Sequence, residues 1–117
     1  MLNVPGQVKV YLCVGATDMR KSFDSLAAMV EEQLQLNPLS GHLFVFRSRR
    51  GDRLKLLYWE ETGYALWYKR LEVGSFRFPA APADKKSLTV SAAELSMLLD
   101  GVDLTSVRRQ KRYRQSA

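Results

Sequence analysis

Cationic and aromatic side chains gather in one part of this sequence, between His42 and Phe78. The segment contains both tryptophans and four of the five phenylalanines, interspersed with lysines and arginines. Aromatic rings can stack on unpaired bases while neighbouring cations contact the phosphate backbone, and arginine-rich turns can lie against duplex phosphates. The segment therefore indicates nucleic-acid binding, with the alternative that the aromatic residues belong mainly to a core.

The formal charge of +6 is concentrated in two places, the stretch from Arg47 to Lys55 and the last ten residues. Such clusters suit a polyanion, because neutralising phosphates releases condensed counterions. We expect the basic tail to lack a stable fold of its own, because it is highly charged and poor in apolar residues. The residues that we predict to contact nucleic acid are Arg20, Lys21, Arg47, Arg49, Arg50, Arg53, Lys55, Trp59, Trp67, Lys69, Arg70, Arg108, Arg109, Lys111, Arg112 and Arg114.

Residues suited to catalysis or to metal binding are few. His42 is the only histidine and Cys13 the only cysteine, so a zinc finger or knuckle is excluded, and Cys13 is interpreted as a small buried hydrophobe. The carboxylates show no recognisable pairing, and no glycine-rich phosphate loop or nucleophile motif occurs. We expect neither enzymatic activity nor a metal or cofactor.

The length of 117 residues predicts one globular unit with appendages. We expect a core domain over residues 1–79, a linker over 80–90, a C-terminal helix and cap over 91–104, and a flexible basic tail over 105–117. No run of about 18 apolar residues could span a membrane, and the first residues do not resemble a signal peptide. The expected location is the cytoplasm, in association with the nucleoid.

The elements that must position the cations and rings form a predicted β-meander. Strands are expected at residues 42–47, 53–59 and 64–71, because β-branched and aromatic residues alternate there between turns at Gly51 and Gly63.

The two tryptophans can be placed on this meander by counting from its second turn. A three-residue loop with Gly63 in the left-handed conformation puts Trp59 and Trp67 on one face, together with Lys55 and Lys69. A shift of one residue in the register would put the tryptophans on opposite faces.

A long helix is predicted before the meander, over residues 21–34. Its apolar residues follow one helical face, and we expect them to cover Leu43, Val45, Leu56 and Leu66 of the sheet. Thr17 or Asp18 is the expected N-cap and Pro38 the stop signal. The apolar face consists of Phe23, Leu26, Ala27, Val30 and Leu34.

Arg20 and Lys21 would then lie in the first turn of this helix, where cations are disfavoured by the helix dipole. They either form a phosphate site with the helix N-terminus or pair with Asp18 and Asp24 or lie in solvent.

Two further elements complete the predicted fold. Residues 8–14 alternate as a strand that should end at Gly15, and a short helix is expected at 92–100. Ser91 and Glu94 have the spacing of a capping box for that helix, and Gly101 the position of its C′ residue. The fold class is therefore α+β, with a mostly antiparallel sheet of about four strands covered by one amphipathic helix, followed by a short C-terminal helix.

Three runs of this sequence resemble the accessory protein of insertion sequence 66 elements, the family of their second open reading frame. The runs are VYLCVGATDMRKSFDSLAAMV, SGHLFVFRSRRGDRLKLLYWEETGYALWYKRLEVGSFRFP and LTVSAAELSMLLDGVDL, which extend from Val10 to about Leu104. The specific motifs are TDMRK at residues 17–21, the group at 50–59 and the group at 63–72. Ser22 and Ser25 stand where the family more often has glycine.

This resemblance implies a small bacterial protein that assists transposition beside a separate transposase, without an assigned active site. The leading hypothesis is a DNA-binding accessory factor in transposition and DNA recombination, with DNA, the transposase and the element's other accessory protein as partners. The alternative is an adaptor that recruits the transposase without appreciable DNA binding. A second copy of the chain, forming a homodimer, is a further candidate partner, and no membrane partner is expected.

Overall fold

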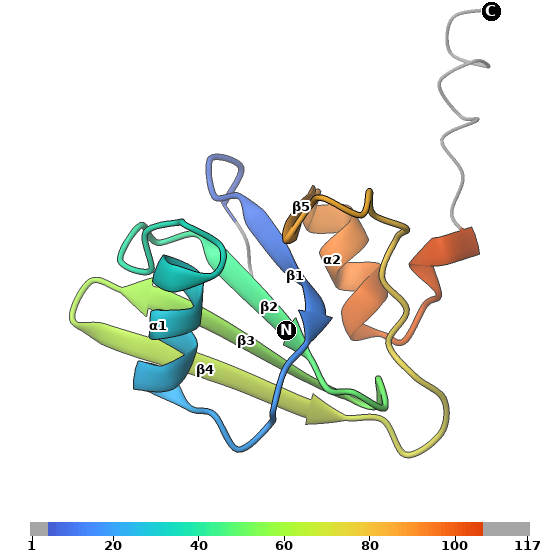
Figure 1. The fold of residues 1–117 in the computed structure, drawn as a ribbon. Coiled ribbons are helices and arrows are strands. Elements are labelled where there is room, and N and C mark those ends of the chain that lie inside the picture. Colours follow the sequence, from blue (N-terminus) through green and yellow to red (C-terminus); the bar gives the residue numbers. More distant parts are fainter. Residues whose placement is uncertain (1–4, 107–117) are drawn as a thin grey trace, which may run out of the picture.

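The computed structural model describes residues 5–106. Within them the α+β class is confirmed, with a five-stranded mixed sheet and two α-helices (Figure 1). The elements in chain order are β1 (Val10–Ala16), α1 (Phe23–Glu32), β2 (Leu43–Arg47), β3 (Arg53–Glu60), β4 (Gly63–Arg70), β5 (Ser87–Val90), α2 (Ala92–Leu99) and a 3-10 turn, η1 (Leu104–Ser106).

The strands follow the spatial order β4-β3-β2-β1-β5. The pairs β2–β3 and β3–β4 are antiparallel, β1 lies parallel to β2, and β5 pairs antiparallel with β1. Residues 87–90 were expected to end a linker but form an edge strand, because β1 offers its free side to them. Gly15 was expected to end the first strand, yet it lies inside β1.

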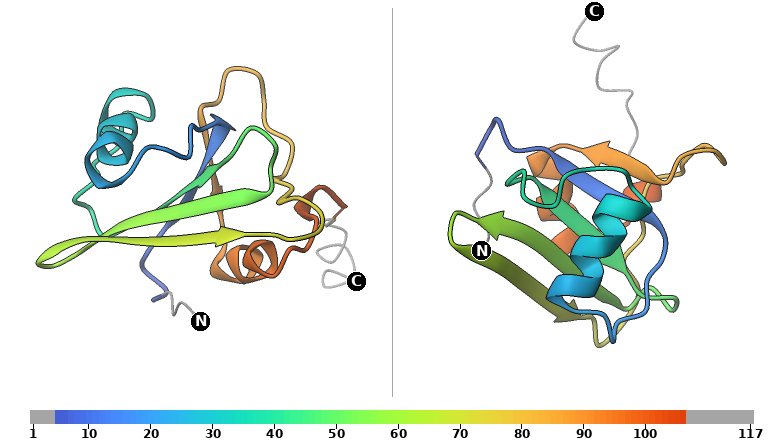
Figure 2. Two further views of the ribbon diagram at one scale, coloured as in Figure 1. Left: turned by 90° about the horizontal axis from the view of Figure 1, so that it is seen from below. Right: turned by 60° about the vertical axis from the view of Figure 1, so that its left-hand side comes forward.

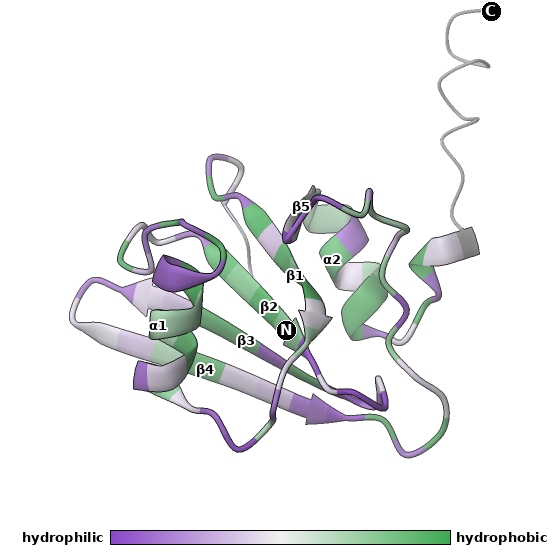
Figure 3. Cartoon of the chain, in the orientation of Figure 1, coloured by the Kyte–Doolittle hydropathy of each residue, from purple (hydrophilic) through white to green (hydrophobic). Residues whose placement is uncertain are grey.

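Each face of the sheet is covered by one helix (Figures 1 and 2). Leu26, Met29 and Val30 of α1 pack in one core with Phe44 and Phe46. The second core lies under α2. Figure 3 shows hydrophobic residues along the inner strands and hydrophilic residues at the C-terminal end of β4 and in the loop between β1 and α1.

Several sheet residues pack on the face opposite to the one that was predicted from the sequence. Leu43, Val45 and Leu56 were expected under α1, but they pack with Leu95 and Leu98 of α2. Side chains alternate along a strand, so burial of Phe44 against α1 directs its neighbours to the opposite face. The C-terminal helix therefore covers one face of the sheet instead of following a completed core.

Helix α1 is shorter than expected at both ends. Its N-cap is Ser22, in an extended conformation, and not Thr17 or Asp18. The Ser22 N–H donates to Ser25 Oγ at 3.0 Å, which satisfies an amide at the start of the helix. The helix ends well before Pro38, because Gln35 adopts the left-handed conformation and Leu36 N–H donates to Val30 O.

The capping prediction for α2 is confirmed. Ser91 Oγ accepts a hydrogen bond from Glu94 N–H at 3.0 Å, and Glu94 Oε1 accepts one from Ser91 N–H at 2.9 Å. Gly101 follows the helix with φ of +85°, as expected of a C′ residue.

Candidate nucleic-acid interface

The register between β3 and β4 separates the two tryptophans. Glu60 pairs with Gly63, so the loop has two residues and Glu61 takes the left-handed conformation that was expected of Gly63. Trp59 consequently faces Tyr64, whereas Trp67 pairs with Leu56 on the opposite face. The predicted shared face of two indoles and two lysines is wrong, because the shorter loop shifts β4 by one residue.

Both tryptophans are partly buried. Trp67 packs against the core under α2. Trp59 meets Tyr64 edge to face, with ring centroids 5.2 Å apart. The rings therefore make packing contacts on two different faces and do not form one platform for stacked bases.

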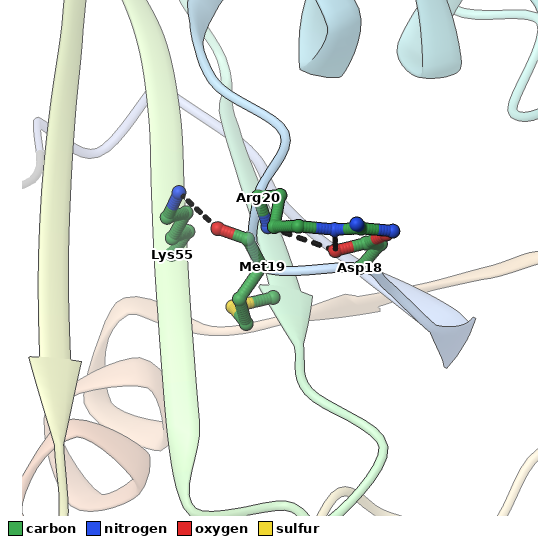
Figure 4. Close-up of polar contacts among 4 residues, drawn as sticks. All are labelled: Asp18, Met19, Arg20 and Lys55. Carbon is green, nitrogen blue, oxygen red and sulfur yellow. Dashed lines mark hydrogen bonds and ion pairs between the residues drawn. The ribbon is translucent and has the colours of Figure 1, made fainter.

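Lys55 is only 6% exposed and holds the loop that precedes α1. Its Nζ donates to Met19 O at 2.8 Å and to Lys21 O at 2.6 Å, and it lies 4.7 Å from the centre of the Tyr68 ring. Figure 4 shows Lys55 reaching from β3 to the loop, where Arg20 extends in another direction along Asp18. Lys55 thus fastens the β1–α1 loop to the sheet.

Lys69 and Arg47 have similar structural contacts. Lys69 Nζ donates to Leu99 O at 2.8 Å, at the C-terminal end of α2, where the helix dipole favours a cation. The Arg47 guanidinium lies 4.1 Å from the centre of the Phe78 ring and donates to Phe76 O at 3.3 Å. Burial and then the nearby Arg77 lower the pKa of Arg47. Lys55, Lys69 and Arg47 were all predicted to contact phosphate, and each of them instead bonds to groups of the protein itself.

The turn between β2 and β3 presents Arg49 and Arg50, and Arg53 follows it as the first residue of β3. We name Arg49, Arg50 and Arg53 the arginine turn. Gly51 N–H donates to Ser48 O at 3.0 Å, which places the exposed Arg49 and Arg50 at the centre of a β-turn.

Ser48 closes the arginine turn from inside. Its N–H donates to Arg53 O, and its Oγ accepts from Arg53 N–H at 3.1 Å. Ser48 was not among the residues predicted to form the site, although serine is favoured at the first position of such turns. The arginine turn is thus held by backbone bonds that leave two guanidinium groups in solvent.

The arginine turn and the β1–α1 loop face one another across a hollow of about 580 Å³. The residues that line the hollow are Ala16, Thr17, Asp18, Met19, Ser48, Arg49, Arg50, Asp52 and Arg53. Both carboxylates among them have partners. Asp18 forms an ion pair with Arg20 at 2.7 Å, and Asp52 Oδ1 accepts from Ser48 Oγ at 3.3 Å.

The ion pair between Asp18 and Arg20 is made by neighbours in the loop before α1. Arg20 Nε and Nη2 both donate to the carboxylate, and these bonds, with the Arg20 N–H, hold the pKa of Asp18 well below its usual range. Lys21 also lies in this loop and not in the first turn of the helix. Of the two interpretations of Arg20, pairing with Asp18 is the one observed.

The other predicted cations lie away from the hollow or beyond the described part. Arg70 is opposite Arg53 in the strand register and pairs with Glu72 at 3.1 Å. The five cations of the tail lie outside the described residues. They are Arg108, Arg109, Lys111, Arg112 and Arg114.

Residues 5–106 contain no group of three or more His, Cys, Asp or Glu side chains placed to hold a metal ion. Cys13 is buried, as expected, and burial raises the pKa of its thiol. No helix in this described part has the length and apolar character needed to cross a membrane.

Comparison with known proteins identifies the family of this chain. The family model described as IS66 Orf2 like protein matches residues 8–109, which include every element described above. The chain belongs to this family. It is accordingly an accessory protein associated with an insertion sequence, as its three sequence runs implied.

Two relatives from Sinorhizobium fredii (strain NBRC 101917 / NGR234) extend the comparison. Uncharacterized protein y4hO is 46% identical over 103 residues, which are 88% of each chain. Uncharacterized protein y4jC is 37% identical over 110 residues, which are 94% of this chain and 92% of the relative. No solved structure matches the chain.

Proposed function

We propose that this insertion-sequence protein assists transposition by binding DNA, and that it seats backbone phosphates in the hollow beside the arginine turn. The observation that carries the proposal is the pair of exposed arginines on one short, hydrogen-bonded turn, Arg49 and Arg50, with Arg53 beside them at the start of β3. Among residues 5–106 the ion pairs join Arg20 to Asp18 and Arg70 to Glu72, which leaves the arginine turn without a carboxylate ion pair.

The geometry of the turn supports phosphate binding over the alternative that these arginines only keep the protein soluble. Arg49 and Arg50 are exposed, while the backbone that carries them is held by Ser48 and by the bond from Phe76 N–H to Gly51 O. A fixed backbone lowers the entropy cost of ordering a guanidinium on an anion. Phosphate contacts of this kind position a protein on DNA without reading its sequence.

Lys55, Lys69 and Arg47 are not part of the proposed contact, because their charged groups already donate to the protein's own carbonyls. The basic tail is proposed to add affinity that is independent of sequence, because its charges can reach phosphates from many orientations.

The test is the salt dependence of DNA affinity for a variant with Arg49→Ala, Arg50→Ala and Arg53→Ala. Loss of three phosphate contacts should reduce the slope of log K against log salt by about 2.7, at roughly 0.9 for each contact. The matched control, Lys9→Ala with Lys85→Ala and Lys86→Ala, removes the same charge from exposed positions away from the hollow. We expect its slope to change much less.

An equal slope in the wild type and the arginine variant would exclude the hollow as a phosphate site. The alternative of an adaptor predicts a different pattern, in which the arginine variant still holds the transposase. Titrating both variants with the transposase in the absence of DNA separates the two functions. An adaptor's affinity for the transposase should survive neutralising the arginine turn, whereas a DNA binder should lose most of its affinity for DNA.

A further inference from the structure

One tyrosine of the sheet, Tyr68, is exposed although its neighbours on the same face are covered. Side chains at alternate positions of a strand share a face, so Tyr64, Leu66 and Tyr68 of β4 point the same way. Tyr64 and Leu66 pack against the core under α1. Tyr68 is 48% exposed, and β4 is an edge strand with no further strand beyond it in residues 5–106 (Figure 1). A phenol ring is therefore open to solvent at the edge of the sheet.

Two cations from β3 hold this exposed ring in place. Lys55 Nζ lies over one face of the ring, 4.7 Å from its centre, and Arg53 Nη1 donates to Tyr68 Oη at 3.3 Å. Lys55 is itself buried, so it closes the face that it covers, and the exposed area belongs to the opposite face and the edge of the ring. A ring fixed in this way loses little conformational entropy when a planar ligand stacks on it.

The exposed ring lies next to the proposed phosphate site. Arg53, Tyr68 and Arg70 line a second hollow of about 320 Å³, and Arg53 also lines the hollow beside the arginine turn. The two hollows thus share Arg53 as a wall. Arg70 is paired with Glu72, so it bounds the second hollow without adding a free charge to it. This arrangement puts a site for a phosphate and a site for a flat ring side by side.

Phosphates and flat rings alternate along a nucleic-acid strand, and a base is free to stack on a protein side chain only where it is unpaired. We propose that Tyr68 is a stacking platform for an unpaired base of single-stranded DNA, whose phosphates lie in the hollow beside the arginine turn. This inference rests on the proposed function, because the same arginines hold the phosphates, and it adds the class of DNA that the site takes. Every base has a π-face, so the contact is independent of sequence. Tyr68 then has the role that was predicted for Trp59 and Trp67.

The test compares two substitutions of Tyr68 on two strands. Tyr68→Leu removes the ring, whereas Tyr68→Phe keeps the ring and removes only the hydroxyl that bonds to Arg53. The first strand is single-stranded oligothymidylate. The second has the same length and the same phosphates but carries abasic tetrahydrofuran units in place of its nucleosides. Fluorescence anisotropy of the labelled strands measures each affinity.

Oligothymidylate should bind Tyr68→Leu roughly 5- to 150-fold more weakly than Tyr68→Phe, which is the range expected for the loss of one base–aromatic stack. The two variants should bind the abasic strand equally, because it offers no base to the ring. Phe23→Leu is the matched control, since Phe23 is 44% exposed and lines neither hollow, and it should bind both strands as the wild type does. The urea unfolding midpoint of each variant checks that it is folded.

Equal binding of oligothymidylate by Tyr68→Leu and Tyr68→Phe overturns the stacking role. A loss of the same size on the abasic strand also overturns it, because the change would then act on Arg53 or on the fold. Neither result affects the phosphate site, which the salt slope of the arginine variant decides separately. Binding of the abasic strand by the wild type, with a slope that the arginine variant reduces, would leave the proposed function standing.

Photochemical cross-linking gives a check that needs no substitution. A strand in which an iodinated uracil replaces thymine cross-links on irradiation to aromatic rings that are stacked on it. In the wild-type protein, Tyr68 should be the residue that mass spectrometry of the digested complex finds cross-linked. Cross-links at Trp59 or Trp67, and none at Tyr68, would overturn the proposal.

Discussion

Replacing Lys55 with methionine tests the interpretation of this lysine as a structural fastener. Methionine keeps most of the apolar stem, so little space opens in the core. The change removes two hydrogen bonds from a charged donor, those to Met19 O at 2.8 Å and to Lys21 O at 2.6 Å. It also removes the contact with the Tyr68 ring.

The expected loss of stability follows from opposing contributions. Hydrogen bonds to a charged group contribute about 1.5 to 3 kcal/mol each, which gives about 3 to 6 kcal/mol for the two. Part of this is offset, because Lys55 is only 6% exposed and burial of its ammonium costs several kcal/mol that the variant recovers. Met19 and Lys21 are only partly buried, so their carbonyls can turn to water. We expect a net loss of about 2 kcal/mol.

Urea unfolding measures the global effect, and hydrogen exchange locates it. The unfolding midpoint should fall while the amides of residues 17–22 lose protection more than the rest of the chain. Lys69→Met is the matched control, because it removes a single bond, to Leu99 O. Its expected cost is about 1 kcal/mol, with lost protection near the end of α2 instead of in the β1–α1 loop.

The same variant separates positioning from phosphate contact. Met19 forms one wall of the hollow, so a loosened loop should weaken DNA binding. The salt slope should stay unchanged, because the buried ammonium touches no phosphate in the proposed complex. Unchanged stability and loop protection would refute the fastening role, and a slope lowered by about 0.9 would show that Lys55 contacts DNA.

Two further predictions concern the turn and the loop that border the hollow. Gly51→Ala should lower the unfolding free energy by about 1 to 3 kcal/mol in urea titration, because φ is +81° and the new Cβ would lie 3.2 Å from Ser75 Cβ. Gly63→Ala is the control and should be near neutral, because the φ of Gly63 is not positive and no atom would lie within 4 Å of the new Cβ. Equal effects of the two changes would contradict this account of the turn. The pKa of Asp18 is held low by Arg20, so the contribution of this ion pair to stability is present above the carboxyl's unfolded pKa and is lost as pH falls through the folded value. NMR titration should find the Asp18 midpoint well below its usual range, and Arg20→Ala should return it toward that range; a midpoint that does not move would exclude the ion pair as the cause.

Much of the local structure could be predicted from sequence because neighbouring residues decide it. The capping box of Ser91 and Glu94 and the turn at Gly51 depend on side chains and torsions within a few residues. The α+β class followed from strand and helix periodicities of the same local kind. The family could be recognised as well, since its motifs are contiguous in the chain.

The arrangement of the site depended on contacts that local patterns do not encode. A loop of two residues instead of three moved Trp67 to the opposite face from Trp59. Strand β5 formed because β1 had a free edge, although residues 87–90 follow a stretch without periodicity. Lys55 and Lys69 look like solvent cations in the sequence, yet each reaches carbonyls about thirty or more residues away.

The arginine turn shows how the two kinds of information combine. Its charge and its glycine are visible in the sequence, and both determine that a basic turn exists. The arginine turn lies across a hollow from the β1–α1 loop only in the folded chain, because Lys55 of β3 positions that loop. Local torsions and charges are properties of short segments, whereas register, burial and the hollow arise from the free energy of packing distant segments together.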